Sequence, residues 1–417
     1  MKHRLFLLLA ACLMLVSGCT RSATPVLLTD HDRLSDGKRP VTGFVSSWFP
    51  HSHPEVMLGR IIRTYSNDGK GEPSQLYLAS LYVDFPRHDD MSAQIAADYD
   101  VRISPTMEDA LTLGTGELAV GGVIICDIWQ DYPYSRTNQM IYPHRKFFDA
   151  AVDVMQRSGK VAPVFVDAYL ADNWEDSWHI YSTAKELGIP LMAGSSVPVG
   201  WRQPKAEIPR GAKVKEIVAI SYHTTDLYGF HGMEMIQTLA ERRAGGETGV
   251  ASVQCLTGQA IWDAEGKVWD RELLADALAR NDPPRTIEYV KENAEDPTLF
   301  IVNYVDGTRA SMFCLNYSVL HWAAAWRYED GTRDSTMFWL HEEATLAHFA
   351  RQVKGIEKMI LTGTPAWPVE RTLLTSGMLH AGHLSKVEGN RVVETPYMSN
   401  IKYTSDWEWT PLAFPDE

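Results

Sequence analysis

The sequence predicts an α/β protein in which a Rossmann-like domain with a doubly wound parallel sheet precedes an α+β domain with an open, mostly antiparallel sheet. Strand-like and helix-like segments alternate between residues 41 and 193, the pattern of a doubly wound sheet. The apolar run GGVIIC at 121–126 is typical of a strand buried on both faces of such a sheet. After Trp201, strand-like segments follow one another around turns such as Asp306-Gly307, as in antiparallel sheets.

In the first half of the chain, each expected strand is followed by an expected helix. Residues 41–45 read as a strand, and in 55–64 the side chains of Val56, Ile61 and Ile62 fall on one helical face. Strands are expected over 41–45, 75–83, 100–103, 121–126, 161–166 and 191–193, and helices over 55–64, 92–99, 107–113, 147–157 and 177–187.

The second half begins with a strand and a long amphipathic helix and closes with two helices. Strands are expected over 213–222, 249–257, 299–304, 309–315 and 336–340, and helices over 232–243, 344–362 and 369–384. Beyond the N-terminal segments, roughly 380 residues exceed one average domain. We therefore expect a first domain over 39–200 and a second domain over 201–417.

The N-terminus reads as a targeting segment. Residues 1–19 combine a basic start with an apolar core that is short for a membrane span, and they end in Val-Ser-Gly-Cys. That ending resembles the lipobox of bacterial lipoproteins, which predicts that Cys19 is lipidated and anchors the protein to a membrane. An ordinary signal peptide cleaved nearby is the alternative. The polar residues 20–38 are expected to form a tether.

The segment also predicts a location. A lipoprotein signal places the protein in the cell envelope, facing the periplasm. Thr20 follows the modified cysteine, in place of the aspartate associated with inner-membrane retention, and this favours the outer membrane.

Charge and cysteine spacing argue against a nucleic-acid partner and against a metal site built from cysteines. The net charge of −14 argues against nucleic acid, because neutralising phosphates needs a basic face. Beyond the targeting segment, Cys126, Cys255 and Cys314 are far apart, odd in number and without metal-ligand spacing. Cys126 lies in an apolar strand and is expected in the core, and the disulfide status of the three stays open.

The order of elements resembles the Gfo/Idh/MocA oxidoreductase family, and the resemblance covers about residues 40–395. The segments that show the resemblance are AQIAADYDVRIS at 93–104, GGVIICD at 121–127 and the closing helical stretch at 346–385. The sequence is most similar to a poorly characterised bacterial branch of that group. The resemblance implies an NAD- or NADP-dependent oxidoreductase and a homo-oligomer assembled through the open sheet.

The sequence departs from the family at the cofactor. Where the family has a G-x-G-x-x-G loop, residues 45–50 read VSSWFP, so side chains crowd the approach of a pyrophosphate. Ser46 and Ser47 are the phosphate contacts that remain available. The family's Glu-Lys-Pro is replaced by Asp167-Ala168-Tyr169, which removes the lysine beside the nicotinamide. Scarce nicotinamide cofactor outside the cytoplasm agrees with this, so NAD or NADP binding is in doubt.

Three acidic or basic positions retain family roles under the resemblance. Asp84 ends the second strand, where the family keeps a ribose-binding acid, although it also suits capping of the next turn. Asp226 and His231 resemble the family's D-x-G-x-H, with one extra residue between them. His231 is then the acid or base facing the substrate. A histidine at a helix N-terminus bonded to backbone is the alternative.

The stretch 127–145, DIWQDYPYSRTNQMIYPHR, follows a buried strand and should line the cleft at the carboxyl ends of the sheet. Aromatic rings next to amide and guanidinium groups suit sugar recognition. The predicted contacts are Trp129, Tyr132, Arg136, Asn138 and Arg145. A tyrosine- and proline-rich loop that only covers the sheet is the alternative.

Asp167 follows the next strand and faces the same cleft, where a carboxylate suits acid–base chemistry or metal binding. His51 and His53 suit a metal ligand pair or polar ligand contacts, and no metal partner is evident from spacing. Two functions stay open. One is an oxidoreductase acting on a sugar-like ligand with His231 as acid–base residue. The other lacks the cofactor: a hydrolase or lyase using Asp167 and His231, or a non-catalytic carbohydrate-binding lipoprotein.

Overall fold

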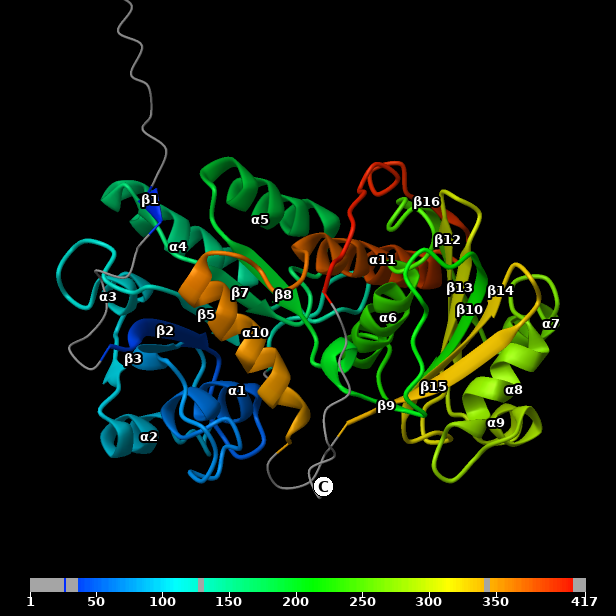
Figure 1. Ribbon diagram of the computed structural model, residues 1–417, viewed down its shortest axis with the longest axis horizontal. Helices are drawn as coiled ribbons and strands as arrows, with labels where there is room; N and C mark the ends of the chain where they lie inside the picture. Colours follow the sequence, from blue (N-terminus) through cyan, green and yellow to red (C-terminus); the bar gives the residue numbers. More distant parts are fainter. Residues whose placement is uncertain (1–25, 28–36, 127–130, 341–345, 408–417) are drawn as a thin grey trace, which may run out of the picture.

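The computed structural model describes residues 26–27, 37–126, 131–340 and 346–407. The predictions for Cys19 and Trp129 lie outside the described residues. Figure 1 shows two sheets side by side, with helices α6 and α11 lying between them. This arrangement confirms the predicted fold class of a parallel Rossmann-like sheet joined to a mostly antiparallel one.

The first sheet has six parallel strands in the order β4-β3-β2-β5-β7-β8. The chain leaves β2 in one direction for β3 and β4 and returns on its other side as β5. The boundary between β2 and β5 is therefore the switch point at which such sheets bind ligands. The strands are β2 (Arg39–Val45), β3 (Leu76–Val83), β4 (Arg102–Ile103), β5 (Val123–Cys126), β7 (Val164–Asp167) and β8 (Leu191–Gly194).

The helices of this domain agree with the predicted segments to within a few residues. Their ends follow local chemistry: Ser52 caps α1 by accepting a hydrogen bond from the Glu55 amide, and Asn173 caps α5 in the same way from Asp176. The helices are α1 (His53–Ile62), α2 (Ser92–Tyr99), α3 (Met107–Thr112), α4 (His144–Ser158) and α5 (Trp174–Leu187). Within the expected tether, Val26–Leu27 (β1) pairs with Lys160–Val161 (β6).

The second sheet has eight strands in the order β16-β11-β12-β13-β10-β14-β15-β9. Only β10 and β13 pair in parallel; the remaining neighbours are antiparallel. The strands are β9 (Trp201–Gln203), β10 (Val214–Ser221), β11 (Val250–Thr257), β12 (Thr298–Tyr304), β13 (Arg309–Cys314), β14 (Trp322–Tyr328), β15 (Arg333–Trp339) and β16 (Val393–Glu394).

Strand β14 was not predicted. Its sequence WAAAWRY has no alternation of polar and apolar residues, because its first five residues are all buried between two covered faces. Three consecutive alanines also carry little strand preference. The strand nevertheless joins β10 to β15 and is needed to continue the sheet.

Three further helices were also missed, and they cover the outer face of the second sheet. They are α7 (Gln259–Asp263), α8 (Arg271–Ala279) and α9 (Ile287–Asn293). Trp269, Leu273 and Leu274 pack from this segment against Val218 and Ile220 of β10 in one buried cluster. The face through which the resemblance implied oligomer assembly is therefore occupied by the chain itself. Homo-oligomerisation stays a prediction and requires another surface.

The last two helices tie the domains together. Helix α10 (His348–Thr362) falls within the predicted second domain, yet its apolar side chains pack into the core of the first, beside Val45 and Trp48. Helix α11 (Val369–Val387) follows and contacts both sheets. A bond from Trp367 Nε1 to the Ala193 carbonyl, at 2.9 Å, fixes the turn between them.

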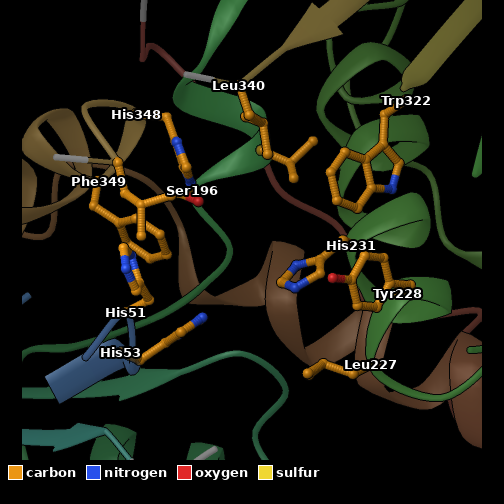
Figure 2. A pocket seen from close by; sticks show the side chains of 12 residues that line it. His51, His53, Ser196, Leu227, Tyr228, His231, Trp322, Leu340, His348 and Phe349 are labelled. Atoms are coloured by element: carbon orange, nitrogen blue, oxygen red, sulfur yellow. The ribbon is translucent and has the colours of Figure 1, made fainter. Parts of the chain in front are cut away.

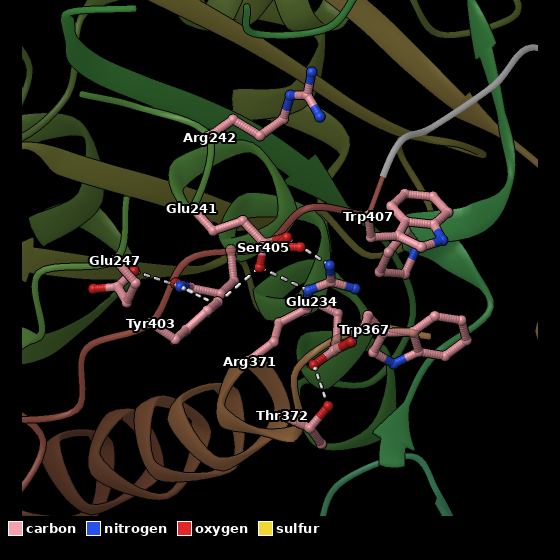
Figure 3. A network of polar contacts seen from close by, with 12 residues as sticks. Glu234, Glu241, Arg242, Glu247, Trp367, Arg371, Thr372, Tyr403, Ser405 and Trp407 are labelled. Atoms are coloured by element: carbon pink, nitrogen blue, oxygen red, sulfur yellow. Dashed lines mark hydrogen bonds and ion pairs between the residues drawn. The ribbon is translucent and has the colours of Figure 1, made fainter. Parts of the chain in front are cut away.

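A buried polar network joins α11 to α6 (Leu227–Ala240) (Figure 3). The Arg371 guanidinium donates two hydrogen bonds, of 2.9 and 2.6 Å, to Glu241, which also accepts the Tyr403 hydroxyl at 2.8 Å. About two turns earlier along α6, Glu234 accepts the hydroxyls of Thr372 and Thr375 at 3.1 and 2.7 Å. Because charged groups this deep are stable only when paired, the network fixes the two helices relative to one another.

Two findings complete the fold. The three cysteines of the described residues, Cys126, Cys255 and Cys314, are buried and unbridged. Within the described segments, the apolar helices are all too short or too polar to cross a membrane.

Candidate active site

A cavity of about 330 Å³ lies between the two domains (Figure 2). The loop after β2 and the start of α10 form one wall, and the start of α6 with Trp322 of β14 forms the other. Four imidazoles line it, from His51, His53, His231 and His348. The first domain places its wall at the β2–β5 switch point, so the cavity occupies the ligand position expected for this sheet.

His53 and Asp167 form a buried imidazole–carboxylate pair. His53 is the first residue of α1, Asp167 ends β7, and His53 Nδ1 lies 2.5 Å from Asp167 Oδ2. Asp167 is only 2% exposed, whereas the imidazole is 13% exposed. A carboxylate holds the proton on Nδ1, so the Nε2 lone pair of His53 is left free. Figure 2 shows the ring of His53 pointing into the cavity toward His231.

His231, in α6 on the wall opposite His53, is held in place by Ser195. Its Nδ1 lies 2.7 Å from Ser195 Oγ, which also accepts the Val197 amide at 3.0 Å. In the described part of the chain, the Ser195 hydroxyl proton has no acceptor other than His231 Nδ1. The imidazole therefore accepts at Nδ1 and carries its proton on Nε2. Gly194 permits this placement: its φ is 117°, and a Cβ there would lie 2.7 Å from Glu234 Oε2.

The surroundings keep His231 neutral. Burial lowers its pKa to about 3, the neighbouring His53 acts in the same direction, and Asp167 opposes both. The rings of Tyr228 and Trp322 stand edge-on to the imidazole at 6.0 and 5.8 Å between centroids. At neutral pH this residue is consequently a hydrogen-bond donor from Nε2, and not an imidazolium.

The structure brings together two of the three residues predicted as catalytic. His231 and Asp167 act on the same cavity, directly and through His53. Asp226 does not line the cavity: it precedes α6, and its Oδ2 accepts the Met140 amide at 2.9 Å. Burial raises its pKa to about 6. The catalytic assignment of Asp226 stays a prediction.

The predicted sugar contacts of the loop after β5 also lie away from the cavity wall. The Tyr132 hydroxyl donates to Asp84 at 3.1 Å, and Arg145 pairs with Asp149 and Asp176. Arg136 and Asn138 are absent from the lining as well; Asn138 is a turn residue with φ 59°. Their role in binding stays a prediction.

Sequence reasoning missed Ser195 as the partner of His231, and it missed His348, Tyr228 and Trp322 as lining residues. Ser195 directly follows strand β8, and no local pattern pairs a serine with a histidine 36 residues away. His348 reaches the cavity only because α10 returns to the first domain.

The loop after β2 is closed by a side chain of the protein itself. The Asp90 carboxylate accepts the Ser47 hydroxyl at 2.8 Å and the Trp48 amide at 2.7 Å. Trp48 is fully buried, and its indole NH donates to Glu55 at 2.5 Å. Backbone bonds from Phe85 to Ser46 and from Met91 to Trp48 join this loop to the loop after β3. The loop after β2 is therefore tightly packed, and the Asp90 carboxylate occupies its Ser47 hydroxyl and its Trp48 amide.

Asp84, predicted to contact a cofactor ribose, is engaged in the same region. It accepts the Tyr82 hydroxyl at 3.0 Å and pairs with Lys146 at 2.8 Å. Ala168, which stands in place of the family lysine, has a left-handed backbone with φ 60° and donates its amide to Gly194 at 3.3 Å. Neither residue requires a ligand to satisfy these contacts.

Comparisons with known proteins relate this chain to others by fold. No protein-family model matches the sequence, and no curated protein sequence does. GenD2 from gentamicin A biosynthesis, in complex with NAD, superposes with a TM-score of 0.55 at 13% identity over 86% of this chain and 96% of that chain. A myo-inositol dehydrogenase from Lactobacillus casei, in complex with NAD(H) and myo-inositol, gives 0.54 at 10% identity over 86% and 96%.

A probable dehydrogenase from Thermotoga maritima gives a TM-score of 0.53 at 13% identity and covers 86% of this chain and 100% of that one. Identities this low show the fold alone. Two of these three structures are described as dehydrogenases, and the shared fold confirms the predicted fold class.

The residues of this chain do not fit a dinucleotide at the first loop. A pyrophosphate bound there would meet the Asp90 carboxylate already seated on the Ser47 hydroxyl and the Trp48 amide. Ser46, the other predicted phosphate contact, is 1% exposed; its Oγ lacks a partner within the described residues but is sealed from the surface. The cavity of about 330 Å³ is at the small end of ligand sites, a size suited to a single sugar ring.

Proposed function

We propose that the protein is a cofactor-independent acid–base enzyme that binds a sugar-like ligand in the interdomain cavity. One observation carries this proposal. Two imidazoles face the same cavity in complementary states: His53 presents a free Nε2 lone pair backed by Asp167, and His231 presents an Nε2 proton backed by Ser195. One is a base and the other a neutral hydrogen-bond donor.

This pair suits proton abstraction next to a carbonyl group, as in isomerases and lyases. His53 Nε2 takes a proton from the carbon beside the carbonyl, and the electron pair of that C–H bond moves to the carbonyl oxygen. His231 donates a hydrogen bond to that oxygen as its negative charge develops, and a neutral imidazole in a buried site is effective in this role. Asp167 stabilises the imidazolium that forms on His53. Return of the proton from His53 to the same carbon, as the electron pair moves back from the oxygen, regenerates the sugar with hydrogen exchanged from solvent. Return of the proton to the former carbonyl carbon gives the isomer, with the neighbouring hydroxyl passing its proton to the former carbonyl oxygen.

The experiment is exchange of carbon-bound hydrogen in D₂O. Purified protein is incubated with a panel of hexoses, ketoses and uronic acids, and the loss of the proton signal beside the carbonyl is followed by NMR. We expect enzyme-dependent exchange with at least one sugar. His53→Gln and His231→Gln should each lower the rate by about 10²- to 10⁴-fold, the usual contribution of acid–base groups.

Asp167→Asn tests the orientation of His53 and should also lower the rate by about 10²-fold or more. His179→Gln is the matched control, because this imidazole pairs with Asp149 on the surface, away from the cavity. Unchanged thermal unfolding of each variant separates chemistry from folding. Full exchange activity in folded His53→Gln would refute the proposal.

A second candidate is an NAD(P)-dependent oxidoreductase acting on a sugar-like ligand, supported by the shared fold with structures described in complex with NAD. Titration of NAD, NADP and their reduced forms by calorimetry separates the two. Binding below about 1 mM, the upper end of typical enzyme affinities for substrates, would favour this second candidate. We expect no binding in that range, because Asp90 occupies the loop.

We also propose that the protein works at the cell envelope, anchored by a lipid on Cys19 and facing the periplasm, with the outer membrane as its destination. The sequence around Cys19 supports this. Expressed in a bacterium with two membranes, the chain should fractionate with the outer membrane and carry acyl groups on its N-terminal peptide by mass spectrometry. Cys19→Ala should abolish the acyl groups, and an unmodified N-terminus in the parent chain would refute the anchor.

A further inference from the structure

We infer that the ligand of the interdomain cavity carries a negative charge and is a sugar acid of the uronate type. The inference rests on the proposed function, since it names the substrate class of the same cavity. It depends on the charge and dipoles that surround the cavity, and not on the proton chemistry of His53 and His231.

The lining of the cavity is rich in nitrogen. Four imidazoles line it, and no carboxylate among the described residues does. Asp167, which is bonded to His53, is 2% exposed. His51 and His348 have no part in the proton transfer. Figure 2 shows these two on the side of the cavity opposite Trp322, where they would flank one end of a bound sugar.

Three helices begin at this cavity. The lining includes the first residue of α1 (His53), the first two of α6 (Leu227 and Tyr228) and the first two of α10 (His348 and Phe349). A helix N-terminus carries partial positive charge. Helix α1 is capped by Ser52 and has Glu55 in its first turn, so its charge is partly offset. Neither α6 nor α10 has a side-chain cap or an acid in its first turn.

Asp226 directly precedes α6, but its side chain does not cap the helix. Asp226 directs its Oδ2 to the Met140 amide and makes no bond to the amides of the helix. The cavity therefore collects four imidazoles and the N-termini of α6 and α10, and Asp167, bonded to His53, is the described acid next to its lining. An anion is the ligand that this surrounding stabilises.

One detail of the wall agrees with a ligand that supplies acceptor atoms. Trp322 is 4% exposed, and its Nε1 proton has no acceptor within the described chain. A carboxylate between His51 and His348 would leave the sugar ring in the space between His53 and His231, in a cavity sized for one ring.

The test compares matched acidic and neutral sugars. Dissociation constants of D-glucuronate and D-galacturonate are measured against D-glucose and D-galactose by calorimetry and ligand-observed NMR at low ionic strength. These pairs differ only in a carboxylate for a hydroxymethyl group. We expect each acid to bind at least about tenfold more tightly, with the ratio shrinking in 0.5 M NaCl as screening increases.

Variants assign the selectivity to the wall. His348→Gln should bring the acid-to-neutral ratio close to one, and so should His51→Gln. His348 is buried and His51 is exposed, so His51→Gln keeps the test available if His348→Gln unfolds the protein. His179→Gln, a surface control, should leave the ratio unchanged. Equal affinity within both pairs, binding of neither acid, or unchanged selectivity in both pocket variants overturns the inference.

These outcomes are distinguishable from failure of the proposed function. Selective binding of the acids without hydrogen exchange in any sugar would support the anionic ligand and refute the acid–base enzyme. Hydrogen exchange with neutral sugars, together with equal affinities, would do the reverse.

Discussion

At the scale of single residues, Asp226 shows most directly how burial sets chemistry. One of its oxygens accepts the Met140 amide, and the Gln139 side chain also favours the charged form. Burial raises its pKa to about 6 from 3.8, and the Met140 amide opposes that change. The folded protein therefore binds this proton more tightly than the unfolded chain does. The favourable contribution of the protonated acid is lost as pH rises from about 4 to about 6.

Replacing Asp226 by asparagine removes the charge and keeps an acceptor for Met140. Above pH 6, we expect the free energy of unfolding of Asp226→Asn to exceed that of the parent by about 2 kcal/mol. The difference should vanish near pH 4. Urea denaturation at a series of pH values measures this. Asp153→Asn, on the exposed side of α4, controls for loss of a carboxylate. A difference that is constant with pH would contradict the argument, and loss of turnover would support the catalytic assignment of Asp226.

Residue identities in the site were partly predictable. His231 and Asp167 follow from their positions, one early in a helix after an acid and the other at the carboxyl end of a buried strand. Their partners were not predictable, because His53 and Asp167 are separated by 114 residues and Ser195 and His231 by 36. Which nitrogen carries the proton depends on these partners, so the complementary states of the two imidazoles emerge only from the fold.

At the scale of elements, the contact of α6 with α11 depends on the buried pair of Arg371 and Glu241. Their side chains are 1% and 3% exposed. Arg371→Leu leaves Glu241 buried with the Tyr403 hydroxyl as its remaining partner, and we expect the free energy of unfolding to fall by about 3–5 kcal/mol. Urea denaturation followed by circular dichroism measures this.

Two comparisons sharpen that prediction. Replacing both partners, Arg371→Leu with Glu241→Leu, should recover part of the loss because no unpaired charge remains buried. Arg157→Leu breaks a surface pair with Glu108, both more than half exposed, and should cost less than about 1 kcal/mol. Equal losses for Arg371→Leu and Arg157→Leu would show that the buried pair has no special role.

Elements were predictable where pattern and position agree. The strands and helices of the first domain were found because each strand is a short apolar run bounded by turn residues. Strand β14 was missed because both of its faces are covered, which erases alternation, and α7 to α9 were missed because they are short. Helix α10 was found as a helix, but its packing against the first domain was not predicted, since an apolar stripe does not say which core it enters.

At the scale of the whole molecule, the cavity exists because three helices from distant parts of the chain begin at one point. Helix α10 returns to the first domain after strand β15 of the second sheet, and it brings His348 opposite the start of α6. No local pattern encodes this convergence. The fold class was predictable, whereas the composition of the cavity depends on the return of α10.

The helical cover of the second sheet gives a test at the same scale. Leu274 of α8 is fully buried against this face. Leu274→Ala should lower the free energy of unfolding by about 2–5 kcal/mol without changing the mass in sedimentation equilibrium, because the face is internal to one chain. Leu320→Ala, at a side chain 55% exposed, is the matched control and should have little effect. A fall in mass with Leu274→Ala would place this face in an interface between copies.

Asp90 makes the shape of the loop after β2 independent of a bound phosphate. Because this carboxylate is covalently part of the chain, its effective concentration at the Ser47 hydroxyl and the Trp48 amide is the same in any surroundings. A loop that relies on a diffusible phosphate would loosen wherever that phosphate is absent. The loop of this protein is instead held by a group that the chain itself carries, so it keeps its shape in a nucleotide-poor medium.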